Sequence, residues 1–587
     1  MNAPALSIRP AQVTPLVARP LPPRRAAAQR QQMVATVHMR LMMLMLLLAL
    51  GVLVVIGRLA MLAIFAGPAD EAARVAAIAA RGDVVDRNGA PLARTIDSWT
   101  IAVHPRRLIG DPMEVAARLA ALMPDRGDQA WFYGQLTRRV NYAYLQQHAS
   151  PALVEQVNAI GEPAIVFSRD TQRLYPQGTL AAHALGFLST DGHGMSGMER
   201  VLEHDLLDPA KIGRPIALAL DTRVQAAMES ELGRAMTAYE AKAAGGIVMD
   251  VRTGEVVAMV SLPTFNPNRV GMAGTDQLRN ATTQSVYELG STFKPIAMAT
   301  AIDAGVETSM AKRFDATAPM RVGGFTIHDD RGHEQKRWLN IPETLIYSSN
   351  IATARIADEV GATRMQAMFR RMGFDSKPGI ELHEKGRPLW PTYWARTTVM
   401  TTAYGHGIAV TPLHLASAYA AMVNGGVYHQ PTLRKVEPGQ AVAGRRVMSQ
   451  ATSDRMRQLL RLIVLEGTGK KGEAPGYRVG GKTGTAEVAQ RGGYAKNANV
   501  STFAAAFPMD APRYVVVAMM DSPHRVAANS FQTTAAYTAA PVVSRVVSRT
   551  GAMLGVMPDA NRDIDERDLL PLIWHGEKKG STVGEAE

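Results

Sequence analysis

The chain has 587 residues, 47% of them hydrophobic and 20% charged, which is too long for one ordinary core and too apolar for a mainly disordered protein. The formal net charge of +12 could suit nucleic acid, but residues 1–40 hold six arginines and no acidic residue, which is half of that charge, and no nucleic-acid motif follows. The absence of cysteine excludes disulfides and cysteine chemistry. We therefore expect two or more folded domains with tails.

An apolar stretch over residues 41–66 predicts a transmembrane anchor, because it is long enough to cross a bilayer as a helix. It follows a basic, Pro-rich leader of forty residues, so we interpret it as an uncleaved anchor and residues 1–40 as a disordered cytoplasmic tail. The arginine excess before the anchor places the following chain outside the cytoplasm. Arg58 interrupts the stretch, and it either extends toward the outer headgroups or meets a partner helix.

Residues 67–225 are expected to form an elongated non-catalytic module, a pedestal. Residues 68–80 are Ala-rich and predict a helical stalk, and RGDVVDRNGAPLA at 81–93 predicts a strand, a turn and a second strand. Helix-like patterns follow between 110 and 160, and a Gly-rich stretch at 191–200 closes the region.

Residues 226–550 predict a second domain of α/β or α+β type that is large enough to bury a full core. AGGIVMDVRTGEVVAMVS at 244–261 predicts a hairpin that enters a larger sheet, and YVVVAMM at 514–520 is among the last strands. The acidic segment that follows, residues 551–587, is expected to be a flexible tail.

Three short motifs in the second domain carry residue types suited to acyl transfer. Ser291 precedes Lys294 by three residues in YELGSTFKP, Ser348 precedes Asn350 by two in YSSNI, and Lys482 opens the run KTGT. The first motif alone is better explained by a helix-capping serine and a solvated lysine, since Ser-x-x-Lys is expected by chance about once in a chain of this length. Ser-x-x-Lys, Ser-x-Asn and Lys-Thr-Gly in this order are, however, the signature set of penicillin-recognising serine enzymes.

The chemistry of these residues can be stated separately. A serine is a weak nucleophile until a base takes its proton, and Lys294 is a base only if burial or a nearby cation such as Lys482 keeps it neutral. Ser348 is expected to relay a proton toward the leaving amine, and Asn350 to hold Lys294 and a substrate amide. The spacing of Ser348 and Asn350 favours a short loop over a helix.

The Lys-Thr-Gly run is expected on a strand that binds the substrate as an added strand, through Thr483, Gly484 and Thr485. Gly484 would let the substrate backbone come close. The backbone N–H groups of Ser291 and Thr485 are the expected donors to the oxyanion.

With these motifs, the segments at 81–93, 173–187, 197–200, 262–268, 404–426 and 466–487 make the chain resemble a class B penicillin-binding protein from Met42 to about Val546. The resemblance implies an α+β multidomain fold: one N-terminal transmembrane helix, a pedestal of the dimerisation type, and a transpeptidase domain like that of serine β-lactamases, with an antiparallel sheet and helices. Within the class it is closer to the septal division type than to the elongation type.

The resemblance also implies a reaction and partners. Ser291 would be acylated by the penultimate D-alanine of a peptidoglycan stem peptide, a neighbouring stem amine would resolve the acyl-enzyme, and β-lactams would trap the serine, with no cofactor or metal. The implied partners are stem peptides, β-lactams, the inner membrane, a polytopic glycosyltransferase and other division proteins, and no nucleic acid. Leu289, Glu487 and Asn266 depart from the family pattern, and the charge of Glu487 is expected near Lys482.

Four alternatives to a septal transpeptidase share some of these features. An elongation-specific transpeptidase or a catalytically minor division scaffold would keep the same fold. A secreted β-lactamase would share the three motifs, but the anchor and the pedestal argue against it. A β-lactam sensor would need a cytoplasmic signalling domain, for which the leader is too short.

Overall fold

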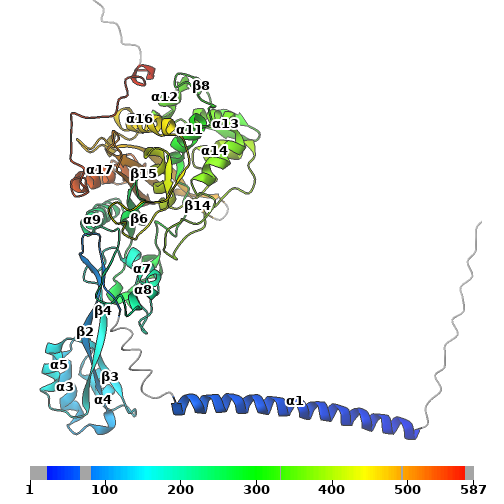
Figure 1. The fold of residues 1–587 in the computed structure, drawn as a ribbon, viewed down its shortest axis with the longest axis vertical. Coiled ribbons are helices and arrows are strands. Elements are labelled where there is room, and N and C mark those ends of the chain that lie inside the picture. The colour runs from blue at the N-terminus through cyan, green and yellow to red at the C-terminus, as the bar shows by residue number, and fades with distance from the viewer. Residues whose placement is uncertain (1–22, 66–80, 331, 491–492, 576–587) are drawn as a thin grey trace, which may run out of the picture. The chain divides into compact units, whose positions relative to one another are not determined.

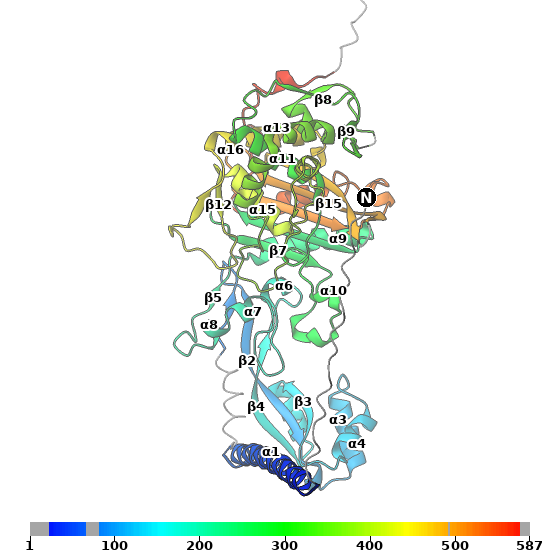
Figure 2. The ribbon, with the colours of Figure 1, turned by 90° about the vertical axis from the view of Figure 1, so that its right-hand side faces the viewer.

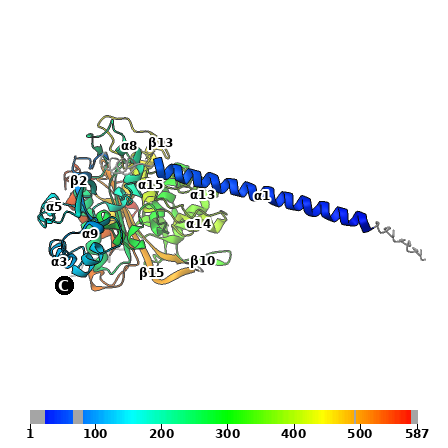
Figure 3. The ribbon, with the colours of Figure 1, turned by 90° about the horizontal axis from the view of Figure 1, so that it is seen from below.

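The computed structural model describes residues 23–65, 81–330, 332–490 and 493–575, and the chain divides into two units, Met1–Arg74 and Val75–Glu587. In the first unit α1 (Pro23–Phe65) is one continuous helix, seen along its length in Figure 3. Its window His38–Arg58 has a mean hydropathy of 2.7 and is long and apolar enough to cross a membrane.

The helix begins earlier than expected. Residues 23–40, predicted to be disordered, continue the apolar helix, because Ala, Gln, Arg and Met have high helix propensity and a proline suits the first helical position. Residues 1–22 of the predicted tail and the stalk predicted at 68–80 lie outside the described residues.

The second unit starts with a five-stranded sheet that forms the pedestal (Figure 1). Its strands pair in the order β3-β2-β1-β5, and β4 also pairs with β2. The predicted hairpin at 81–93 is confirmed as the antiparallel pair β1 and β2. Asp86 closes its turn by accepting the N–H groups of Asn88 and Ala90, both at 2.8 Å. The bounds are β1 (Val84–Val85), β2 (Pro91–Val103), β3 (Ala143–Ala149), β4 (Ile165–Leu174) and β5 (Ile216–Ala217).

Three helices pack beside β3 and the far ends of β2 and β4, as Figure 2 shows. They are α3 (Pro112–Leu122), α4 (Gln129–Leu136) and α5 (Pro151–Asn158), and Asp111, Asp128 and Ser150 cap their N-termini. The helices predicted between 110 and 160 are therefore confirmed, with β3 as an intervening strand that the helical pattern did not indicate.

A buried ion cluster joins the pedestal hairpin to the Gly-rich stretch. Glu199 is 1% exposed and its two carboxylate oxygens pair with Arg81 at 2.7 Å and Arg173 at 2.8 Å. Arg81 also pairs with Glu203 at 2.7 Å. Because every charge in the cluster has a partner, its burial is tolerated, whereas removal of one member would leave buried charges unpaired.

The second domain is built on an antiparallel sheet of five strands in the order β14-β15-β16-β6-β7. The predicted hairpin at 244–261 is confirmed as β6 and β7, and the predicted strand at 514–520 is β16. β14, which carries Lys-Thr-Gly, lies at the edge of the sheet. The bounds are β6 (Ala243–Asp250), β7 (Val256–Leu262), β14 (Gly480–Gln490), β15 (Gly493–Phe507) and β16 (Tyr514–Asp521).

Each face of this sheet has its own hydrophobic core, as the alternation along β16 shows. Val515, Val517 and Met519 belong to a core with α11 (Lys294–Asp303), α13 (Asn350–Arg371), α15 (Pro412–Val423) and α16 (Gln450–Glu466). Val516, Ala518 and Met520 face a second core with α9 (Thr222–Ala238) and α17 (Ala539–Thr550). A sheet buried on both faces explains why its strands read as continuous apolar runs.

The shorter elements connect these layers. They are α6 (Ala182–Leu185), α7 (Gly197–Val201), α8 (Glu203–Leu207), α10 (Thr275–Leu278), α12 (Ile341–Ile346), α14 (Arg396–Ala403), β8 (Arg313–Asp315), β9 (Met320–Val322), β10 (Phe325–Ile327), β11 (Trp338–Asn340), β12 (Val427–His429) and β13 (Gly444–Arg446), with short 3-10 turns that include η3 (Gly290–Phe293).

The segment after α17 differs from the prediction of a flexible tail at 551–587. Its described part, up to residue 575, packs against the domain: Asp563 pairs with Arg461 at 2.6 Å, and Leu569 is fully buried. Asn340 donates to the carbonyl of Leu572 at 2.7 Å. The apolar group LLPLI supplies this contact, but it has no strand or helix period that sequence analysis could recognise. Residues 576–587 lie outside the described part.

Candidate active site

Ser291 lies in η3, the turn that leads directly into α11 at Lys294. The helix start predicted at the Gly-Ser step is therefore a 3-10 turn followed by an α-helix. Gly290 has φ +54°, and a Cβ at this position would lie 2.8 Å from the carbonyl oxygen of Thr485. Glycine is needed here because the turn carrying Ser291 lies directly against β14.

Ser291 borders a cavity of about 1160 Å³. The three predicted motifs meet here, since Ser348, Thr483 and Thr485 line the same cavity. His406 and Glu487 also border it. The turn η3, the residues before α13 and the edge strand β14 therefore form one site from segments far apart in the sequence.

Two buried lysines converge on the hydroxyl of Ser348. Lys294 Nζ donates to Ser348 Oγ at 3.1 Å and also to the Ser348 carbonyl. Lys482 Nζ donates to Ser348 Oγ at 2.9 Å and to the carbonyl of Thr483 at 3.0 Å. Ser348 has φ +59°, a conformation that costs free energy for a residue with a side chain. Ser348 is thus the group that connects both lysines.

Burial makes both lysines easier to deprotonate. Loss of solvation lowers the pKa of Lys294 from 10.5 to about 8, although the negative charges of Asp330 and Asp329 oppose this. Burial also lowers the pKa of Lys482 well below its usual range, and the positive charge of Lys294 lowers it further. Of the two causes considered for Lys294, burial acts on its pKa, whereas the like-charge effect acts on the pKa of Lys482.

Asn350 does not hold Lys294 as predicted. It is the first residue of α13, not a loop residue, and its amide donates to the carbonyl of His328 at 3.0 Å. Ser348 holds Lys294 instead. The reason is that Ser349 caps α13, accepting the N–H of Ala352 at 3.1 Å, so the helix begins one residue after the cap.

Asp329 and Asp330 are site residues that sequence reasoning missed. Asp329 is buried and accepts the hydroxyl of Ser349 at 3.0 Å and the N–H of Ile351 at 3.0 Å, which fixes the start of α13. Asp330 borders the cavity, and its charge raises the pKa of Lys294. No motif distinguishes this pair in the sequence, because its position follows from the packing of the chain between β10 and α12.

β14 presents the Lys-Thr-Gly run at the edge of the sheet, as predicted. The hydroxyl of Thr483 shares a hydrogen bond with that of Thr468 at 2.8 Å, and Thr485 Oγ1 accepts the N–H of Ala535 at 3.1 Å. Glycine was expected at position 484 to let the substrate backbone come close, but the structure gives another reason for it. A Cβ there would lie 2.3 Å from the carbonyl oxygen of Leu289, so glycine allows the nucleophile turn to pack on β14.

Glu487 is exposed at the cavity, and its charge acts on the pKa values of His406 and Tyr494, not on that of Lys482. Burial lowers the pKa of His406 and raises the pKa of Tyr494, and the negative charge of Glu487 opposes the first shift and adds to the second. The cluster of Glu288, His406 and Tyr494 beside the cavity was not predicted, since a lone histidine in YGHG has no distinguishing signal.

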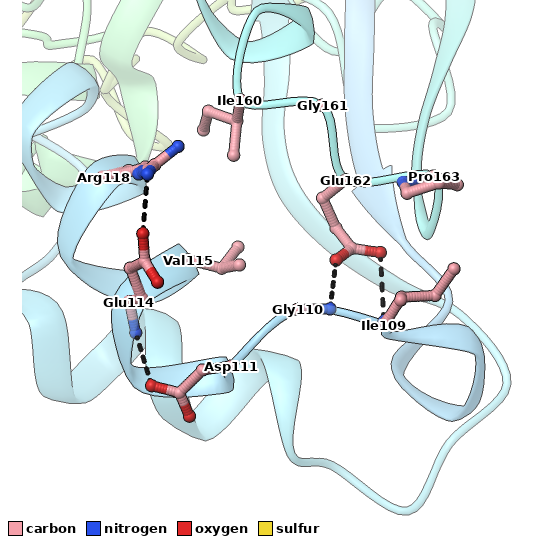
Figure 4. Close-up of a pocket in the computed structure, with 10 residues that line it drawn as sticks. All are labelled: Ile109, Gly110, Asp111, Glu114, Val115, Arg118, Ile160, Gly161, Glu162 and Pro163. Atoms are coloured by element: carbon pink, nitrogen blue, oxygen red, sulfur yellow. Dashed lines mark hydrogen bonds and ion pairs between the residues drawn. The ribbon is translucent and has the colours of Figure 1, made fainter.

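A smaller hollow of about 250 Å³ lies in the pedestal, between α3 and the turn before β4 (Figure 4). Its carboxylates are already bonded: Glu114 pairs with Arg118 at 2.6 Å, and Glu162 accepts the N–H of Gly110 at 2.8 Å. Neither serine nor lysine lines it. These contacts stabilise the pedestal, so we assign this hollow no catalytic role.

The chain matches two family models and many known proteins. Residues 244–547 match the penicillin binding protein transpeptidase domain, and residues 76–207 match the penicillin-binding protein dimerisation domain. The chain is 40% identical over 494 residues to the probable peptidoglycan D,D-transpeptidase FtsI of Caulobacter vibrioides, covering 81% of this chain and 82% of that protein. It is 27% identical over 540 residues to peptidoglycan D,D-transpeptidase FtsI of Escherichia coli K12, covering 85% and 88%.

Solved structures of a penicillin binding protein also resemble this chain. The crystal structure of penicillin binding protein 3 from Mycobacterium tuberculosis, complexed with aztreonam, superposes with a TM-score of 0.64 at 26% identity, covering 83% of this chain and 98% of that chain. The ampicillin complex of the same protein gives a TM-score of 0.64 at 27% identity, covering 82% and 96%. With its N-terminal apolar helix, its dimerisation module and its transpeptidase domain, this chain belongs to the class B penicillin-binding proteins.

Proposed function

We propose that this protein is the serine D,D-transpeptidase that cross-links peptidoglycan stem peptides at the division septum. The observation that carries the proposal is the convergence of two buried lysines on Ser348, in the cavity that contains Ser291. Such an arrangement makes a lysine beside a serine easier to deprotonate, as nucleophilic catalysis requires.

In the first half of the reaction Ser291 Oγ attacks the carbonyl carbon of the penultimate D-alanine. Neutral Lys294 takes the serine proton, and Ser348, which accepts hydrogen bonds from both lysines, passes a proton to the nitrogen of the departing D-alanine. The C–N bond breaks, and the acyl group stays on Ser291. A β-lactam forms the same ester, but its leaving group stays attached, so the serine is trapped.

The negative oxygen of the tetrahedral intermediate needs two donors. The N–H groups of Ser291 and Thr485 are the proposed pair, supported by the close approach of Gly290 to the Thr485 carbonyl. The substrate backbone would add to the edge of β14 beside Thr483 and Thr485, while Asn350 would contact its amide from the start of α13.

The N-terminal helix and its flanking charges indicate the membrane location and orientation of the enzyme. The arginine-rich leader supports an inner-membrane protein with a cytoplasmic N-terminus and a periplasmic catalytic domain. The two matched family models are a transpeptidase domain and a dimerisation domain, and a polytopic glycosyltransferase of the division machinery would supply the glycan strands. Arg58, at the end of the apolar window, is a candidate contact for that partner.

Intact-mass spectrometry of the full chain with penicillin tests the chemistry. We expect one covalent adduct in the wild type and none in Ser291→Ala, and peptide mapping should place the adduct on Ser291. An adduct on Ser348, or labelling that persists in Ser291→Ala, contradicts the assignment. A fluorescent fusion should collect at the septum, and depletion should give filaments; round cells would indicate the elongation role instead.

A further inference from the structure

A half-buried histidine, His406, borders the cavity of Ser291 and has no role in the acylation half of the reaction. It lies just after α14, between two glycines. A Cβ on Gly405 would lie 2.1 Å from the carbonyl oxygen of Gly290, so the backbone before His406 touches the backbone before the nucleophile. This contact brings the backbone of His406 next to the turn that carries Ser291, and both side chains border the same cavity.

A carboxylate lies beside this imidazole. Glu288, three residues before Ser291, has one oxygen 3.6 Å from His406 Nδ1. Its other oxygen accepts the N–H of Gly407 at 3.0 Å, and the hydroxyl of Tyr494 donates to the carboxylate at 3.1 Å. The Glu288 side chain is 11% exposed and so is held by these three groups. A carboxylate beside Nδ1 favours the tautomer with its proton there, which leaves the lone pair of Nε2 free to accept one.

We propose that His406 is the general base that takes the proton of the acceptor amine in the second half of the reaction, with Glu288 as its positioning residue. The proposal rests on the transpeptidase function above. The amine nitrogen of a second stem peptide, arriving neutral, attacks the ester carbonyl carbon and forms the C–N bond. His406 Nε2 accepts one proton from that nitrogen. The C–Oγ bond then breaks, Ser291 Oγ recovers a proton from the imidazolium, and no co-reactant is consumed.

Exposure distinguishes His406 from the two lysines. The side chains of Lys294 and Lys482 are fully buried, and both donate to Ser348. An amine carried by a bulky stem peptide therefore contacts neither lysine nitrogen directly and would exchange protons with them only through the Ser348 hydroxyl. The His406 side chain is 35% exposed at the cavity, so an incoming amine can contact it.

The protonation state suits a base. Burial lowers the pKa of His406 below its usual value, the nearby cation Lys294 lowers it further, and Glu288, Asp330 and Glu487 oppose these effects. The rings of Tyr404 and Tyr494 complete its surroundings, with centroids at 5.4 Å and 6.3 Å. The net lowering keeps the imidazole neutral at neutral pH, where a general base must be unprotonated.

The experiment separates the two halves of the reaction in the full-length chain in detergent micelles. The donor is an N-acyl-D-alanyl thioester, whose thiol release reports acylation, and the acceptor is D-alanine, whose new amide reports transfer. We expect His406→Gln to acylate within about twofold of wild type but to transfer about 100-fold more slowly, which is the usual contribution of a general base. His429→Gln, which replaces a half-buried histidine on β12, is the matched control and should leave both rates unchanged.

Two further readouts exclude a merely structural role. Imidazole added to His406→Ala should raise the transfer rate in proportion to its concentration. Glu288→Gln removes a charge that favours the imidazolium, so the acid limb of the transfer rate should move to lower pH. Transfer within twofold of wild type in His406→Gln, or an equal fall of both rates without imidazole rescue, overturns the proposal. Absence of acylation in the wild type would instead overturn the transpeptidase function itself.

Discussion

Replacement of Lys294 by methionine should abolish acylation and at the same time make the folded protein more stable. Lys294 is a fully buried cation at the start of α11, and methionine has a similar length without the charge. We expect the variant to lose covalent labelling by penicillin because Ser291 loses its base. The stability gain follows from the cost of keeping an ammonium in a site that excludes water.

The size of this gain can be worked from the structure. The fall in the Lys294 pKa from 10.5 to about 8 corresponds to about 3.4 kcal/mol of destabilisation at pH 7. The methionine variant loses two hydrogen bonds to Ser348, which contribute about 1 kcal/mol each. The net gain is therefore about 1–2 kcal/mol, or a rise in Tm of about 2 °C for a domain of this size.

The sign of the pH dependence gives a second check. Because the folded pKa lies below the unfolded one, the unfolded chain binds more protons between about pH 8 and 10.5, so this contribution makes wild-type stability rise with pH across that window. The stability advantage of the variant at pH 7 should accordingly be lost by pH 10, where the wild type should be the more stable of the two by about 1 kcal/mol. Acylation of the wild type should rise about tenfold from pH 7 to pH 9, as the neutral fraction of Lys294 rises from about 9% to about 91%.

Differential scanning fluorimetry and fluorescent-penicillin labelling of the full chain measure both effects. Lys377→Met, at an exposed lysine, is the matched control and should change neither. A fall of several degrees in the Tm of Lys294→Met at pH 7 would refute the argument from burial. Acylation of that variant within about tenfold of wild type would show that Lys294 is not the base.

Two other substitutions test packing. Gly484→Ala should lower the acylation rate by at least about tenfold and the free energy of unfolding by about 1–3 kcal/mol, because the added methyl group would displace the turn that carries Ser291. Gly134→Ala is the control, since Gly134 has open space around it. Equal acylation rates in the two variants would contradict the packing role of Gly484. Glu199→Gln should lower the free energy of unfolding in chemical denaturation by about 3–5 kcal/mol, since it leaves two buried arginines without their shared carboxylate. Glu114→Gln, which removes the charge of an exposed ion pair, is the control and should lower it by less than about 1 kcal/mol. Equal losses of stability in the two variants would refute the role of burial.

Local sequence patterns predicted several secondary-structure elements of this protein. The hairpins at 81–93 and 244–261 and the strand that carries Lys482 could be predicted, because alternation, turn residues and motif spacing act over short distances. The family resemblance supplied the order of the domains.

Contacts between distant segments could not be predicted in the same way. The hydroxyl of Ser348 joins lysines 54 and 134 residues away, and only the packing of η3 against β14 decides this geometry. Asn350 was assigned to Lys294 on chemical grounds, but the cap at Ser349 turns its side chain toward His328. Glu288 and His406, 118 residues apart, meet for the same reason, and neither residue type is unusual enough in sequence to suggest the pair.

The C-terminal segment holds the residues that precede Ser348. The Tyr347 hydroxyl donates to the carbonyl of Trp574 at 3.4 Å, Glu343 accepts the N–H of Trp574 at 3.1 Å, and the Arg337 guanidinium lies over the rings of Tyr347 and Trp574, at 5.4 Å and 4.9 Å.

A ribosome makes Trp574 more than two hundred residues after Ser348. The contacts of Tyr347 and Glu343 with Trp574 can therefore form only after residue 574 has been synthesised. A nascent chain halted before this residue would carry all three catalytic motifs without the contacts that hold the residues before Ser348.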